Sequence, residues 1–116
     1  MPAYNFKARF ADDVENGRKR QTIRKNRKRQ TKPRETLYLY TGMRSKKCRK
    51  LLEVTCKSVE PIKIYSDLRI RVGKKQLTIV DVEALALSDG FKNVSEFYNF
   101  FENQYGLPFN GELIKW

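Results

Sequence analysis

The stretch Gly17-Arg18-Lys19-Arg20-Gln21-Thr22-Ile23-Arg24 is predicted to join the end of a helix to the start of a strand. Residues 10–16 have the pattern of a short amphipathic helix, the glycine suits the left-handed conformation that ends a helix, and residues 19–24 begin a strand. Alternation along a strand places Lys19 and Thr22 on opposite faces, so their side chains meet only if the segment begins as a turn. The glycine permits such a turn. A lysine beside a threonine hydroxyl could serve either a reaction or the binding of a phosphate.

Positive charge is concentrated in the half of the chain that contains this stretch. The chain has 25 Lys and Arg against 13 Asp and Glu; residues 1–50 hold 17 of these bases and 4 of the acids, whereas residues 51–116 hold 8 and 9. Residues 18–34 alone contain ten basic residues and no acid. This asymmetry predicts a polyanionic partner, with a nucleic acid or a nucleotide as the leading class. The alternative is a solvated loop that aids solubility.

Length and composition predict one domain over residues 1–116. A chain of 116 residues with 40% apolar content can bury a real core. Histidine is absent, which excludes catalysis through that residue, and the two cysteines lack a paired spacing, so we expect no metal site and no cofactor. No apolar run is long enough to cross a bilayer, so we expect a soluble cytoplasmic protein without a membrane partner.

The remaining periodicity predicts mainly strands, followed by helices. Helical spacing is predicted over residues 10–16, from Asp81 to Asp89-Gly90, and from Asn93 or Ser95 to Gly106. Strands are predicted over residues 4–10, 19–24, 36–41, 51–59, 62–65, 68–72, 76–80 and 113–116, with a break near Pro61. This order predicts an α+β fold, a mainly antiparallel β-barrel with helices attached. The aromatic stripe of the last helix is predicted to be core.

Residues 25–35 are predicted to form an exposed basic loop. The stretch is polar and cationic and contains Pro33, so it cannot pack into a core and should be mobile. It is a candidate phosphate clamp.

Residues 17–24 also fit the order glycine, any, lysine, any, any, threonine, any, arginine, which is the signature of the ASCH domain, a branch of the PUA-like superfamily of RNA-associated β-barrels. Further segments resemble the small ASCH proteins often encoded by bacteriophages and prophages: Arg9-Phe10, Asp12-Asp13, residues 37–40, residues 41–46 and Asp89-Gly90-Phe91. The resemblance implies a PUA-like barrel and, for a phage protein, the host cytoplasm. Many relatives have a glycine and an aspartate where this chain has Arg34-Glu35, so we expect a different turn and a looser loop there.

The small bacterial ASCH enzymes that this chain resembles remove the acyl group from acetylcytidine with a lysine, a threonine and a carboxylate. The resemblance places these roles on Lys19, Thr22 and Asp89, with Glu83 and Glu53 as alternative carboxylates because aspartate is one methylene shorter than glutamate. No metal is needed, since a desolvated lysine crowded by cations has a lowered pKa and can act as a base toward a hydroxyl or a water. A ribonuclease activity has also been proposed for ASCH relatives.

The leading expectation is a module that binds RNA or a nucleotide in a basic cleft. The expected nucleic-acid-binding residues are Arg18, Lys19, Arg20, Thr22, Arg24, Lys25, Arg27, Lys28, Arg29, Tyr40, Arg44 and Lys46. The alternative is a metal-independent hydrolase, either an acetylcytidine amidohydrolase or a ribonuclease, that uses Lys19, Thr22 and a carboxylate. A third hypothesis is a protein partner, such as a host factor or an acidic protein.

Overall fold

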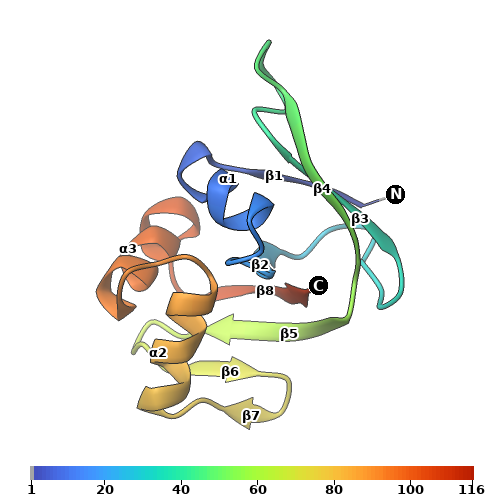
Figure 1. Ribbon diagram of the computed structural model, residues 1–116. Coiled ribbons are helices and arrows are strands. Elements are labelled where there is room, and N and C mark those ends of the chain that lie inside the picture. Colours follow the sequence, from blue (N-terminus) through green and yellow to red (C-terminus); the bar gives the residue numbers. More distant parts are fainter. Residues whose placement is uncertain (1) are drawn as a thin grey trace.

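The computed structural model of the protein describes residues 2–116, which form an α+β fold with three helices and two sheets (Figure 1). The helices are α1 (Ala8–Glu15), α2 (Ile79–Ser88) and α3 (Val94–Tyr105). The strands are β1 (Ala3–Phe6), β2 (Gln21–Lys25), β3 (Thr36–Thr41), β4 (Arg49–Thr55), β5 (Ser58–Ile64), β6 (Ile70–Val72), β7 (Lys75–Gln76) and β8 (Phe109–Lys115). The predicted α+β class is confirmed. None of the helices in this part of the chain is long and apolar enough to span a membrane.

The strands of the described residues form two mostly antiparallel sheets, and these do not close into a barrel. One sheet has the strand order β1-β3-β4 and the other β2-β8-β5-β6-β7, and within residues 2–116 no strand pairing joins them. Only β1 and β3 pair in parallel, whereas the other paired strands of this region are antiparallel. The chain crosses between the sheets at Cys56 and Lys57, because β5 pairs with β8 and does not extend the smaller sheet.

Side chains link the two sheets where strand pairing is absent. β1 and β2 are edge strands of different sheets. The Arg24 guanidinium of β2 donates a hydrogen bond to the Asn5 carbonyl oxygen of β1 at 2.7 Å. Deeper in the molecule, the Phe6 ring of β1 contacts the Trp116 ring edge to face, with the ring centres 6.0 Å apart. Trp116 is buried and belongs to the core.

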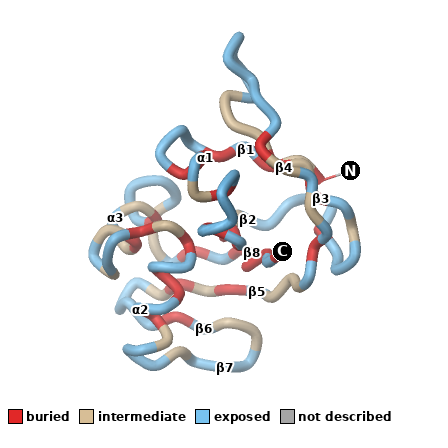
Figure 2. The backbone as a smooth tube through the Cα atoms, in the orientation of Figure 1, coloured by how far each residue is buried: buried red, intermediate tan, exposed pale blue. Residues whose placement is uncertain are grey.

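The buried apolar residues form one cluster, and buried positions occur along strands of both sheets and along the helices (Figure 2). Leu37 and Leu39 of β3 are fully buried. Phe101 of α3 packs against Phe109 of β8 with ring centres 5.2 Å apart, and Phe97 is fully buried beside it. Burying each such side chain contributes about 1.5–3 kcal/mol. The prediction that the aromatic stripe of α3 belongs to the core is confirmed for these two phenylalanines.

Several predicted boundaries are corrected by the structure. The first strand ends at Phe6, before α1. Strands β4 and β5 are separated at residues 56–57, and Pro61 lies inside β5, where it is exposed. Residues 79–80 begin α2 and do not end a strand, because Thr78 caps the helix and forms a capping box with Asp81.

The last strand is longer than predicted and central to its sheet. It begins at Phe109, four residues before the predicted start, and pairs with β2 on one side and β5 on the other. By contrast, β3 spans the predicted residues 36–41, and Asn93 caps α3 as one of the two predicted starting residues.

The basic segment between β2 and β3 is mostly exposed, as predicted, and several of its residues contact β1 or one another. Thr31 is buried and its hydroxyl hydrogen-bonds to the Tyr4 hydroxyl. The guanidinium of Arg27 lies 4.0 Å from the centre of the Tyr4 ring and donates to a backbone carbonyl of β1. Arg34 has a φ of 75°, in the region that favours glycine. The Glu35 carboxylate accepts a hydrogen bond from the Lys32 backbone N–H at 2.7 Å, which closes the turn.

Candidate functional site

The start of β2 places Lys19 inside the protein. Helix α1 is followed by Gly17 with a φ of 78°, the left-handed conformation predicted for it. The Lys19 backbone N–H then donates to the Asp13 carbonyl oxygen at 2.9 Å, which turns the chain back across the end of the helix before β2 begins. Residues 17–20 thus precede the strand as a bend, the condition under which Lys19 and Thr22 can share a site.

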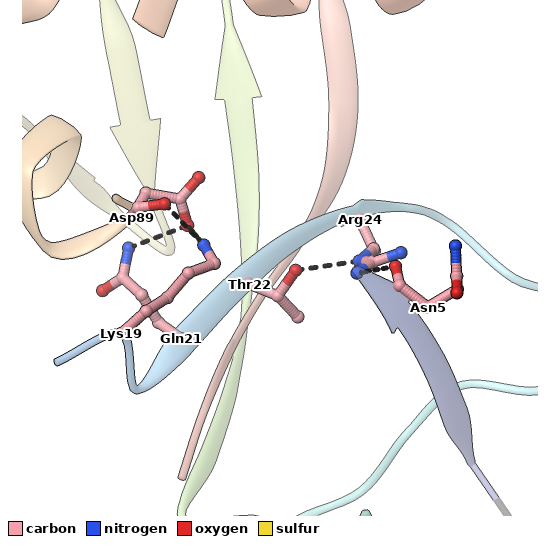
Figure 3. Close-up of polar contacts among 6 residues, drawn as sticks. All are labelled: Asn5, Lys19, Gln21, Thr22, Arg24 and Asp89. Carbon is pink, nitrogen blue, oxygen red and sulfur yellow. Dashed lines mark hydrogen bonds and ion pairs between the residues drawn. The ribbon is translucent and has the colours of Figure 1, made fainter. Parts of the chain in front are cut away.

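Lys19 and Asp89 form a buried ion pair across 70 positions of the sequence. Lys19 Nζ donates to Asp89 Oδ1 at 3.0 Å and to the Asp89 carbonyl oxygen at 2.6 Å (Figure 3). Only 4% and 6% of the two side chains are exposed. Asp89 is the C-cap of α2, so Lys19 also satisfies a carbonyl at a helix end, where a cation is favourable. Gln21 Nε2 adds a longer contact to Oδ1 at 3.4 Å.

Burial moves the pKa of each partner toward its neutral form. Desolvation lowers the pKa of Lys19 from its ordinary value of 10.5; the attraction of Asp89 opposes this shift, and the positive charge of Arg24 adds to it. Desolvation raises the pKa of Asp89 from 3.8, opposed by Lys19 and Gln21. Each charge therefore depends on the other, because removing one would leave a buried charge without compensation.

Thr22 and Arg24 lie on the same side of β2, since they are two residues apart on a strand. Thr22 is buried, and its Oγ1 accepts a hydrogen bond from Arg24 Nε at 2.8 Å (Figure 3). The guanidinium carbon of Arg24 lies 4.8 Å from the centre of the Phe6 ring. Burial lowers the pKa of Arg24, but a guanidinium remains protonated in proteins. These contacts fix a cation beside the Thr22 hydroxyl.

Lys19, Thr22, Arg24 and Asp89 line one pocket of about 240 Å³, which we call the Lys19 pocket. Aromatic rings supply much of its wall: Phe6, Phe10, Phe91, Phe100, Phe101 and Tyr105. Polar groups are contributed by Asn5, Lys7 and Gln104, and Lys7 Nζ donates to Gln104 Oε1 at 3.1 Å. The pocket combines flat apolar rings with a few polar groups, the usual composition of a small-molecule site.

Two further pockets continue from the Lys19 pocket along the basic side of the molecule. The Arg44 pocket, of about 580 Å³, shares Asn5 and Arg24 with the Lys19 pocket and is also lined by Arg27 and Arg44. The Glu112 pocket, of about 410 Å³, shares Arg27 with the Arg44 pocket. Its other charged lining residues are Lys28, Lys63, Arg71 and Glu112. Each pocket shares wall residues with the next and cations line all three, so we refer to them together as the series of pockets.

The three residues predicted to be catalytic come together in the structure. Lys19, Thr22 and Asp89 all line the Lys19 pocket. The alternative carboxylates do not line it: Glu53 pairs with Lys50 on β4, and Glu83 is exposed on α2. Among the candidates named from the sequence, Asp89 is therefore the carboxylate that the fold brings to Lys19.

The residues predicted to bind nucleic acid divide into two groups. Those that line the series of pockets are Lys19, Thr22, Arg24, Arg27, Lys28 and Arg44. Arg18, Arg20, Lys25 and Lys46 are exposed and line none of the three pockets, and Arg18 pairs with Asp13. Arg29 pairs with Glu35 and lines a further pocket, which shares Arg27, Lys28 and Gln30 with the Glu112 pocket. Tyr40 is half-buried on β3 and lies outside the cleft predicted for it, because the leucines of that strand occupy its buried positions.

Sequence reasoning missed several lining residues. Tyr105 follows Phe101 by one helical turn, so the aromatic stripe extends to the rim of the Lys19 pocket. Helical spacing could have identified this tyrosine. Asn5, Gln104 and Glu112 carry no comparable signal, because they reach the pockets through tertiary contacts.

The chemistry open to the Lys19 pocket is that of an amine, a hydroxyl and a carboxylate. Within residues 2–116, no group of three or more cysteine, aspartate or glutamate side chains is close enough to hold a metal ion. The pocket can bind an aromatic ligand between its rings and an anion at Arg24. A neutral Lys19 could in addition accept a proton.

In comparisons with known proteins, no family model, no curated protein and no solved structure matches this chain. Its function is therefore inferred from the geometry and charge of these pockets.

Proposed function

We propose that this protein binds single-stranded RNA or a nucleotide, with a base in the Lys19 pocket and phosphates on the arginines of the adjoining pocket. We also infer that it is an ASCH domain of the PUA-like superfamily. Three of the four signature residues, Lys19, Thr22 and Arg24, line one pocket, which supports that relationship.

The walls of the Lys19 pocket suit a single aromatic base. Its volume of about 240 Å³ lies just below the range of about 300–1,000 Å³ that accommodates drug-sized ligands. The Tyr105 side chain is 41% exposed, and its ring stacks on that of Phe101 with an angle of 25° between their planes. One ring face is thus braced by the core, the arrangement in which a base can stack on a tyrosine at low entropic cost.

The observation that carries the proposal is that neighbouring basic pockets share wall residues. Arg24 belongs to both the Lys19 pocket and the Arg44 pocket, so a phosphate attached to a base bound in the first pocket would meet the cations of the second. A small neutral substrate would not need this extension. Because cations line neighbouring pockets, successive phosphates of an RNA strand could each contact one of them.

A salt titration of RNA binding tests the proposal. Fluorescence anisotropy with a labelled single-stranded RNA of about eight nucleotides should show affinity that falls with salt. If Arg24, Arg27, Lys28 and Arg44 each neutralise a phosphate, the slope of log K against log salt should be about −3. Binding that is absent at low salt, or independent of salt, would contradict the proposal.

A matched pair of variants locates the binding site. Arg44 and Lys46 are both exposed in the same loop, but only Arg44 lines a pocket of the series. Arg44→Ala should therefore weaken RNA binding and reduce the salt slope by about 0.7, whereas Lys46→Ala should change both less. If the two substitutions changed RNA affinity and salt slope equally, the loop would contribute only its overall charge, and Arg44 would have no specific place in the binding site.

The alternative of a hydrolase is favoured by one observation, the burial of Lys19 in the same pocket as Thr22. A neutral Lys19 would take the proton of the Thr22 hydroxyl or of a water, and the oxygen would attack the acyl carbonyl while Arg24 stabilised the oxyanion. The amino group of the cytosine would then leave with that proton, and where Thr22 is the attacking group, a water would afterwards release the acyl group from its oxygen as the free acid. Against this, Thr22 Oγ1 already accepts from Arg24, and Lys19 Nζ is held by two oxygens of Asp89.

Activity assays separate the alternative from the proposal. The same protein samples should be incubated with acetylcytidine and with RNA, and the products followed by chromatography. Turnover that Thr22→Val abolishes and Thr22→Ser retains would establish an enzyme. Intact substrates together with salt-dependent RNA binding would leave the pocket as a binding site.

A further inference from the structure

Glu112 is a buried carboxylate that the proposed function does not yet use. It lies in the middle of β8, opposite Arg24 of β2 and Pro61 of β5. Only 4% of the residue is exposed, and its Oε2 has no hydrogen-bond partner within residues 2–116. Buried acceptors are rarely left without a donor, and a charged one is the most costly to leave so.

Arg27 acts on Glu112 through its charge, which opposes the rise in the Glu112 pKa that burial causes, but it forms no hydrogen bond or ion pair with the carboxylate among the described residues. Arg27 lines the same pocket, but its guanidinium stacks on Tyr4 and donates to the Ala3 carbonyl oxygen at 2.9 Å. None of the ion pairs found among the described residues includes Glu112. The carboxylate is therefore an acceptor that a ligand could satisfy.

The lining of the Glu112 pocket restricts the chemistry of that ligand. Lys28, Lys63 and Arg71 line the same pocket of about 410 Å³, so the surroundings repel a metal cation and attract a phosphate. The ligand must combine an anionic group with N–H donors for the carboxylate. A nucleotide meets both requirements.

Among the common bases, guanine offers the carboxylate the best match. Its N1–H and N2–H donors lie side by side on the Watson–Crick edge and can each donate to one oxygen of a carboxylate, which accepts two such bonds. On the same edge, adenine and cytosine place a ring nitrogen acceptor beside their amino group, and uracil places carbonyl oxygens beside its N3–H. In each case an acceptor of the base would face a carboxylate oxygen, which is unfavourable. A site with a buried acceptor discriminates strongly against a ligand that leaves it unpaired.

We propose that the Glu112 pocket is a second base-binding subsite, selective for guanine, and that it binds the same RNA strand that places another base in the Lys19 pocket. The inference rests on the proposed function. It is supported by the Arg44 pocket, which shares Arg27 with the Glu112 pocket and Arg24 with the Lys19 pocket.

The experiment compares three RNAs that differ at one base. Anisotropy is measured for the full chain with an eight-nucleotide adenine strand, and with the same strand carrying one guanine or one inosine, which lacks the N2 amino group. Wild-type protein should bind the guanine strand about 5-fold to 100-fold more tightly than the adenine strand, the discrimination expected for one bidentate contact. The affinity for the inosine strand should lie between the affinities for the guanine and adenine strands.

Variants then assign the preference to the carboxylate. Glu112→Gln should remove the guanine preference, so that the guanine strand and the adenine strand bind the variant with equal affinity. Glu60→Gln on the neighbouring strand β5 is the matched control, because Glu60 does not line the pocket, and it should retain the preference. A guanine preference that survives Glu112→Gln would overturn the inference.

The outcomes separate this inference from the proposed function. Equal, salt-dependent binding of all three strands by wild-type protein would overturn the guanine subsite and leave RNA binding intact, and this comparison needs no variant to fold. Absence of binding to every strand would overturn both.

Discussion

The buried pair of Lys19 and Asp89 predicts a large and pH-dependent cost for Asp89→Asn. In the wild-type protein, Lys19 Nζ donates to Asp89 Oδ1 at 3.0 Å and also to the Asp89 backbone carbonyl. Asparagine retains both of these oxygen acceptors. The substitution therefore removes the charge while it leaves the hydrogen bonds possible. Lys19 would then be a buried cation without a counter-charge, since only 4% of its side chain is exposed.

The expected loss of stability in Asp89→Asn follows from the burial of the ion pair. Breaking a buried ion pair by removing one partner costs about 3–5 kcal/mol, and the retained hydrogen bonds place this variant near the lower end, at about 3 kcal/mol at pH 7. An exposed pair costs about 1 kcal/mol or less, so Asp13→Asn, which affects the exposed pair with Arg18, is the matched control.

The pH dependence has a definite sign. Without Asp89, the pKa of Lys19 is lowered further, because the attraction that opposed its desolvation is lost. A lysine whose folded pKa lies below its unfolded value destabilises the fold while it is charged, and the destabilisation is relieved as the pH rises through the folded pKa toward 10.5. The deficit of Asp89→Asn should therefore shrink with rising pH.

Urea denaturation followed by circular dichroism at a series of pH values between 6 and about 10 measures this effect, with each variant compared with wild type at the same pH. A deficit below about 1 kcal/mol that is constant with pH would refute the reasoning, because it would mean that Lys19 and Asp89 are not held as a buried charged pair.

Four other substitutions test separate features of the fold and the site. Arg34→Gly should raise the free energy of unfolding by about 0.5–1 kcal/mol in thermal denaturation, because the residue has a φ of 75°; a loss of stability would contradict this. Gly111→Ala should lower it by at least about 3 kcal/mol, because the new Cβ would lie 2.2 Å from the Arg24 carbonyl oxygen, and near-native stability would show that the strands can separate there. Glu112→Gln should raise the stability at pH 7 by about 1 kcal/mol, since an unpaired buried carboxylate becomes neutral; a decrease in the urea midpoint would show that the carboxylate is already satisfied. Tyr105→Ala should reduce RNA affinity by about 1–3 kcal/mol in the anisotropy assay through lost stacking, and unchanged affinity would exclude this ring as a base platform.

Local patterns of the sequence predicted many of the elements. The alternation over residues 36–41 predicts the strand that becomes β3, and Asn93 and the Asp89-Gly90 pair mark the helix ends where the structure has them. These features depend on neighbours in the chain, through capping groups and side-chain period, so they can be read without tertiary contacts. The ends of β5 and β8 were predicted less well, because their extent depends on the strands that pair with them.

By itself, the sequence determined the α+β class, the basic first half, and the presence of a lysine and a threonine near one strand start. Only the tertiary structure decided which side chains meet: Asp89 reaches Lys19 from 70 residues away, and Tyr105 and Glu112 enter neighbouring pockets from later elements. It also decided that the strands form two sheets with Arg24 between their edges. The physical reason is that backbone preferences act over a few residues, whereas burial, charge pairing and strand pairing depend on packing between segments that the local pattern does not relate.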